Sequence, residues 1–154
     1  MKENILTEEG LRQERLRSSL ENFSYVNAHE KASVLLVFRG IKPATSIDFM
    51  YLPDVPDRKF AGISNEEDLQ AACKQLEKIL SDAGLKYVLN ITEIFDQVII
   101  RQVEFYISRD QETAEALAKA SEDKDKRTFG KLVGYPETAV EAFVSGESAD
   151  IEID

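Results

Sequence analysis

The chain has 154 residues, of which 43% are hydrophobic and 31% are charged, a balance typical of a soluble globular domain and not of a disordered chain. Its formal net charge of −10 disfavours nucleic acid and anionic membranes as partners, because their phosphates would be repelled. The longest apolar run, residues 34–38, is far shorter than the roughly 20 residues that cross a bilayer. We therefore expect neither a nucleic-acid nor a membrane partner.

The few residues suited to metal or redox chemistry limit the function further. The chain holds one cysteine, Cys73, and one histidine, His29, so it can form neither an intramolecular disulfide nor a zinc site of four nitrogen and sulfur ligands. The first residues lack the apolar segment of a secretory signal, and no glycine motif for phosphate or dinucleotide binding is present. We expect a cytoplasmic protein with no metal site and no cofactor.

The first predicted element is an amphipathic helix over about residues 7–22. Thr7, followed by two glutamates, is typical of a helix start. Leu11, Leu16 and Leu20 lie roughly on one side, and charged residues fill the other. We interpret this helix as an addition to the domain that either docks on it or mediates association.

A β-hairpin is predicted next. Residues 34–39 form a β-rich run that ends at Gly40. Residues 46–51 alternate between polar and apolar side chains, which is the period of a half-buried strand. The short connection between the two runs favours antiparallel pairing, and two prolines within 52–57 end the second strand.

A helix over about 65–83 has the strongest pattern in the chain. Ser64 and Glu67 have the spacing of a capping box at its start, and Gly84 follows its last apolar residue. Leu69, Leu76 and others recur at helical spacing between these signals, which predicts an inward-facing apolar stripe.

A second hairpin and a helix follow. Residues 85–91 and 97–108 are the two predicted strands, and Asp110 is the predicted N-cap of the helix that comes after them. On the second strand, alternation places Arg101 on the same face as Val103 and Phe105.

The segment 127–146, RTFGKLVGYPETAVEAFVSG, combines two glycine stops with a Tyr-Pro step. Gly134 closes a short turn, and Pro136 suits the first position of a further helix, which Gly146 ends. We predict a fixed corner, built either for packing or for a site. The acidic residues 147–154 are a predicted disordered tail.

Together these elements predict a single α+β domain over residues 1–146. Its core is a four-stranded antiparallel or mixed sheet, formed by two β-hairpins. The helices pack mainly on one face of the sheet, with the N-terminal helix as an extra element.

Polar residues on the strands and at the C-terminal corner are the candidates for a ligand site. Arg101 lies where the pattern expects a core residue, and a buried arginine must be paired or bind an anion. The alternative is a solvated sheet face that carries cross-strand ion pairs. The candidates are Arg39, Asp48, Arg101, Glu104, Tyr106 and Tyr135.

No nucleophile and base are placed together by the sequence, so we expect a binding protein without catalytic machinery. Its ligand is a protein partner, a second copy or a small polar molecule. The alternative is an enzyme on the sheet face. In that case Arg39 or Arg101 holds a small anionic substrate, and Asp48 or Glu104 acts as the base.

Overall fold

The computed structural model describes residues 7–95 and 99–145. The elements are α1 (Glu8–Glu21), α2 (Ala28–Phe38), β1 (Ala44–Tyr51), α3 (Glu66–Asp82), β2 (Lys86–Phe95), β3 (Ile99–Ser108), α4 (Gln111–Glu122), α5 (Lys126–Leu132) and α6 (Glu137–Ser145). Within those two ranges, no helix has the length and apolar character needed to span a membrane.

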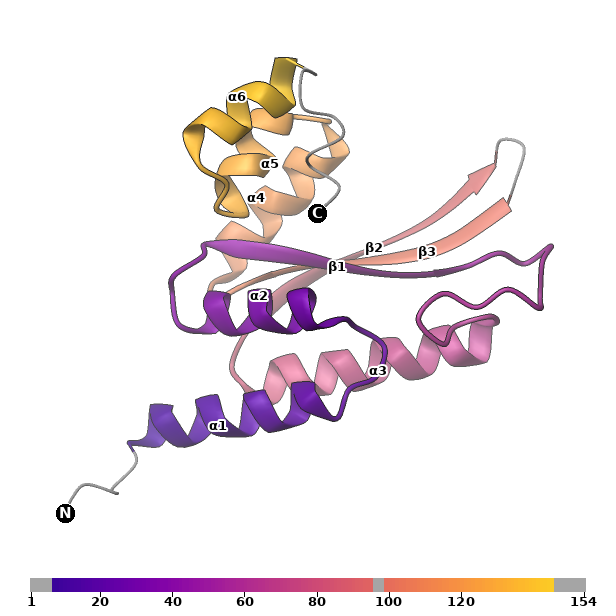
Figure 1. The fold of residues 1–154 in the computed structure, drawn as a ribbon, viewed down its shortest axis with the longest axis horizontal. Helices are drawn as coiled ribbons and strands as arrows, with labels where there is room; N and C mark the ends of the chain where they lie inside the picture. Colours follow the sequence, from indigo (N-terminus) through magenta and orange to yellow (C-terminus); the bar gives the residue numbers. More distant parts are fainter. Residues whose placement is uncertain (1–6, 96–98, 146–154) are drawn as a thin grey trace.

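The sheet has three antiparallel strands in the order β1-β3-β2. Helices α1, α2 and α3 lie on one face of this sheet, and α4, α5 and α6 lie on the other (Figure 1). The predicted α+β class is confirmed. The predicted four-stranded sheet is wrong, and so is the placement of the helices mainly on one face.

The error arises at residues 34–39, which belong to α2 and its C-cap and form no strand. Asn27 begins this helix through a complete capping box. The side chain of Asn27 accepts from the Glu30 N–H at 2.8 Å, and the side chain of Glu30 accepts from the Asn27 N–H at 2.9 Å. The first predicted hairpin therefore does not exist, and β1 pairs instead with β3.

Other helix starts agree more closely with the sequence. The side chain of Thr7 caps α1, and that of Asp110 caps α4, as predicted. The N-cap of α3 is Asn65, which accepts from the Asp68 N–H at 2.8 Å. The prediction that Ser64 and Glu67 form this cap is wrong by one residue.

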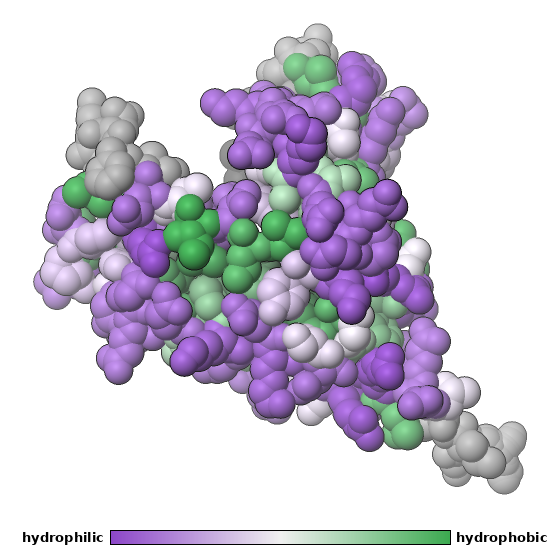
Figure 2. Space-filling model, turned by 180° about the vertical axis from the view of Figure 1, so that it is seen from behind, coloured by the Kyte–Doolittle hydropathy of each residue, from purple (hydrophilic) through white to green (hydrophobic). Residues whose placement is uncertain are grey.

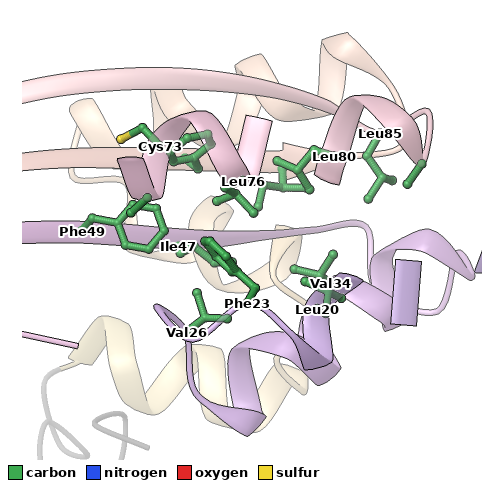
Figure 3. Close-up of a cluster of buried hydrophobic side chains, with 14 of the residues drawn as sticks. Leu20, Phe23, Val26, Val34, Ile47, Phe49, Cys73, Leu76, Leu80 and Leu85 are labelled. Carbon is green, nitrogen blue, oxygen red and sulfur yellow. The ribbon is translucent and has the colours of Figure 1, made fainter. Parts of the chain in front are cut away.

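The main core lies between the sheet and the first three helices (Figure 3). Ile47, Phe49 and Phe105 project from the strands, and each is at most 2% exposed. Leu76 and Leu80 of α3 pack against them. Helix α1 contributes Leu16 and Leu20, which are 2% and 1% exposed, so it buries an apolar stripe in this core.

A smaller core lies on the other face. It contains Ala44 and Tyr106 from the sheet, Leu117 and Ala118 from α4, and Val133 after α5. In Figure 1, α4, α5 and α6 cover one end of the sheet, and the far part of the β2-β3 hairpin extends beyond them.

The C-terminal corner is built on the end of α5. The Tyr135 N–H donates to the Gly130 carbonyl at 2.9 Å, and the Gly134 N–H donates to the Lys131 carbonyl at 3.1 Å. This pair of bonds is a Schellman motif, and Gly134 supplies the positive φ of 85° that it requires. Gly146 and the predicted tail 147–154 lie outside the described residues.

Replacing Leu20 with alanine tests whether α1 belongs to the cooperative core. We expect Leu20→Ala to lower the free energy of unfolding by about 2–5 kcal/mol, because it leaves a cavity. Leu11→Ala is the matched control on the same helix, since Leu11 is 41% exposed; its effect should stay within about 0.5 kcal/mol. Urea denaturation measures the free energy of unfolding of both variants. Equally small effects would show that α1 is not part of the cooperative core.

Candidate functional site

The six predicted site residues lie in four separate places. Arg39 is the exposed C-cap residue of α2. Arg101 projects from β3 toward α3, whereas Asp48, Glu104 and Tyr106 lie on the opposite face of the sheet. Tyr135 belongs to the C-terminal corner. The structure therefore does not bring the two arginines together with the sheet carboxylates.

Arg101 is paired within the chain. Its Nε donates to Glu66 Oε1 at 3.0 Å and its Nη2 donates to Glu66 Oε2 at 2.9 Å, while the Tyr51 hydroxyl donates to Glu66 Oε1 at 2.9 Å. The Arg101 side chain is 19% exposed and that of Glu66 is 45% exposed. The hydrogen bond from Arg101 is the main cause that lowers the pKa of Glu66 to about 2. The carboxylate of Glu66 is therefore the counterion of Arg101.

Asp48, Glu104 and Tyr106 form a polar cluster on the other face. Asp48 lies directly opposite Glu104 on the neighbouring strand, and Gln102 Nε2 donates to Asp48 Oδ2 at 2.6 Å. The Tyr106 hydroxyl donates to Ser121 Oγ at 2.9 Å. Burial is the main cause that raises the pKa of Glu104.

A pocket of about 350 Å³ opens beside this cluster. It is lined by Asn90, Ile91, Thr92, Glu104, Tyr106, Ser121 and Glu122. Its charged lining residues are both acids, so the pocket would repel an anionic substrate. This arrangement does not favour the predicted chemistry of an arginine acting together with a carboxylate base.

A different pocket, of about 270 Å³, lies between α2, β1 and α5, and we call it the lysine pocket. It is lined by Asn27, His29, Glu30, Ser33, Lys42, Thr45, Ser46, Phe129, Val133 and Tyr135. Tyr135 is the one predicted site residue among them. The polar residues come from α2, from β1, from the connection between them and from the corner after α5, and the apolar wall comes from Phe129 and Val133.

Local structure places each polar group in the lysine pocket. The cap at Asn27 starts α2 so that His29 and Ser33, one turn apart, share a face of the helix. Gly134 lies against Lys42, and a Cβ added to it would be 3.5 Å from Lys42 Cγ and Cε. The lysine stem therefore packs close to the glycine that ends α5, and the positive φ of Gly134 is what favours glycine there.

Lys42 lies in this pocket without a counterion. Among the described residues its one hydrogen bond is to Ser33, whose Oγ accepts from Lys42 Nζ at 3.4 Å. Burial is the sole cause that lowers the pKa of Lys42. Glu30 also lines the pocket, but its carboxylate accepts the Asn27 N–H of the capping box. A partly desolvated ammonium without a counterion is costly, and an anion would relieve that cost.

Sequence analysis missed Lys42, Ser33 and Thr45. One signal was present: Asn27 and Glu30 have capping-box spacing, and the helix that they start places His29 and Ser33 on one face. No local sequence pattern predicts the burial of Lys42, because residues that cover it come from α5 and from the corner after α5.

In the ranges that the structure covers, no group of three or more His, Cys, Asp and Glu side chains is placed to hold a metal ion. No protein-family model, curated protein or solved structure matches this chain. The geometry of the pockets is therefore the basis on which function is inferred.

Replacing Glu66 with glutamine tests the Arg101 pair. A lowered folded-state pKa contributes stability above the ordinary value of 4.5, and this contribution disappears as the pH falls through about 2. We expect Glu66→Gln to lower the free energy of unfolding at neutral pH by about 1 kcal/mol, allowing for solvent screening. The difference from wild type should shrink between pH 4.5 and 2.

Urea denaturation at several pH values measures this difference. Glu67→Gln is the matched control. Glu67 is exposed and lies in the same first turn of α3, and its substitution removes the same charge. A Glu66→Gln effect that is no larger than the control, or that does not change with pH, would contradict the pair's contribution.

Proposed function

We propose that this protein binds a small organic anion of single charge, a carboxylate, in the lysine pocket, and that it performs no reaction on this ligand. The observation that carries the proposal is the half-buried ammonium of Lys42, which has no carboxylate partner in the described part of the chain. A ligand carboxylate would supply the missing counterion.

The charge of the pocket favours a monoanion. Lys42 contributes one positive charge, and Glu30 lies in the same lining. With one positive and one negative charge already in the lining, a doubly charged phosphate would add more uncompensated negative charge than a carboxylate does. A carboxylate has two oxygens, and the hydroxyls of Ser33, Thr45 and Tyr135 are the groups available to donate to the second one.

The size and walls of the pocket favour a small ligand with a short apolar body. Its volume of about 270 Å³ lies just below the range of about 300–1,000 Å³ common for drug-sized ligands. Phe129 and Val133 form the apolar part of the lining. These walls would stabilise a short hydrocarbon chain or a single ring.

The geometry supports binding more than catalysis. Ser33 and Lys42 have the identities of a nucleophile and a base, but their 3.4 Å separation exceeds the roughly 2.6–3.2 Å of an activated pair. Ser33 also lies within α2 and is only 5% exposed.

A cytoplasmic location belongs to the same proposal, and the single buried thiol of Cys73 is consistent with it.

Removing the lysine charge is the direct test. We expect Lys42→Met to abolish binding of acetate, butyrate and benzoate, which isothermal titration calorimetry measures. The free protein should be at least as stable as wild type in a thermal melt, because the substitution removes an unpaired, partly buried charge. Lys78→Met is the matched control, because Lys78 is 78% exposed on α3.

The panel also separates the ligand classes. Butyramide, which has the shape of butyrate without its charge, should bind at least about tenfold more weakly than butyrate. Inorganic phosphate should bind more weakly than the best carboxylate. Retained carboxylate binding in Lys42→Met, or equal binding of butyramide, would overturn the proposal.

The pH dependence of carboxylate binding follows from the pKa of Lys42. The bound anion interacts with the charged amine, and burial lowers the pKa of that amine below its ordinary value of 10.5. Affinity should therefore be constant near neutral pH, where the ligand is ionised, and fall as the pH rises through the lowered pKa, by about tenfold per pH unit. Calorimetry between neutral pH and 10.5 measures this slope, and an affinity that rises with pH would contradict it.

A further inference from the structure

The outer side of β2 is an unpaired sheet edge. In the order β1-β3-β2, strand β2 pairs only with β3. In the described part of the chain, residues of β2 make no backbone hydrogen bonds to turns, loops or caps. The outward N–H and C=O groups of an edge strand are a template for another strand.

The sequence of β2 does little to protect this edge. The strand has ten residues, which is long for a strand, and its central residues 87–92 include no charge, proline or glycine. Ile91 is 61% exposed. Figure 2 views the molecule from behind, where β2 is the nearest strand, and shows apolar side chains gathered along the middle of this face.

The opposite edge differs. Strand β1 carries the exposed Asp48, and two prolines follow it within residues 52–57. Charges and prolines at an edge are the usual means by which proteins prevent strand addition. The contrast singles out β2 as the edge that is open to a partner.

We propose that β2 pairs with β2 of a second copy of this chain across a two-fold axis, which gives one antiparallel sheet through both copies. A two-fold interface needs a self-complementary patch. With Asn90 on the axis, Leu89 lies opposite Ile91 of the other copy, and Val88 lies opposite Thr92. Opposite residues share a face of the sheet, so these apolar and β-branched pairs pack together.

The charges on β2 itself do not oppose a second copy at this place. The net charge of −10 makes two copies repel each other at most approaches. The charged residues of β2 are Lys86 and Glu93, which cancel. In the register centred on Asn90, Glu93 lies opposite Tyr87 of the other copy, so like charges do not face each other.

Sedimentation equilibrium of the full chain tests the inference. We expect a dimer for wild type and at least about tenfold weaker association for Ile91→Lys, because two lysines would be buried at the interface. Ile41→Lys is the matched control and should remain dimeric, because Ile41 is 59% exposed and lies in the connection before β1. Circular dichroism should show that both variants are folded.

Cross-linking tests the register. In a Cys73→Ala background, Asn90→Cys should form a disulfide-linked dimer under mild oxidation, since residues facing each other on a two-fold axis come within disulfide reach. Ile41→Cys in the same background should not. A wild-type monomer at about 0.5 mM would overturn the inference. So would a dimer that persists in Ile91→Lys and is not cross-linked through position 90. None of these results depends on the lysine pocket.

Discussion

The alternation of β3 is the constraint on which the rest of the structure depends. β3 is the central strand and pairs with a neighbour on both sides, so each of its side chains must suit one of two helical layers. Val103, Phe105 and Ile107 face the main core, and Tyr106 faces the smaller one. A shift of one residue would exchange these sets and turn Gln102 and Glu104 toward the main core.

The same alternation explains the Arg101 pair. It places the guanidinium of Arg101 on the core face near the start of β3, beside the first turn of α3. Glu66 lies in that turn, where a carboxylate also interacts favourably with the helix dipole. The pair therefore lies at the edge of the main core and gives Arg101 a counterion within the chain, whereas Lys42 lines its pocket without a carboxylate partner among the described residues.

Much of the fold could be predicted because its signals are local. The caps at Thr7 and Asp110, and the alternation that places Arg101 with Val103, depend on neighbouring residues and are confirmed. Residues 34–39 were predicted wrongly because a short apolar run fits a buried strand and a buried helix equally well. The Asn27 cap decides between them, and missing it led to the wrong hairpin and the wrong sheet.

The lysine pocket could not be predicted because its properties arise from distant segments. Lys42 is a loop lysine by sequence, and it becomes desolvated only where the corner at Gly134 packs against its stem. That corner was predicted as an ordered feature, and Tyr135 was proposed as a site residue. The sequence does not show that this corner packs against Lys42. The contact joins positions far apart along the chain, and no helical or strand periodicity relates them.

The topology sets the relation between the two proposed surfaces. The lysine pocket lies beside β1, and the unpaired edge lies on β2, with β3 between them. A dimer through β2 would leave each pocket open and lined by residues of one copy. Coupling between two bound ligands would have to pass through β3 or through α4 and α5, because no pocket residue lies on β2 and α4 packs against both β2 and α5. The structure therefore favours two independent carboxylate sites on one continuous sheet.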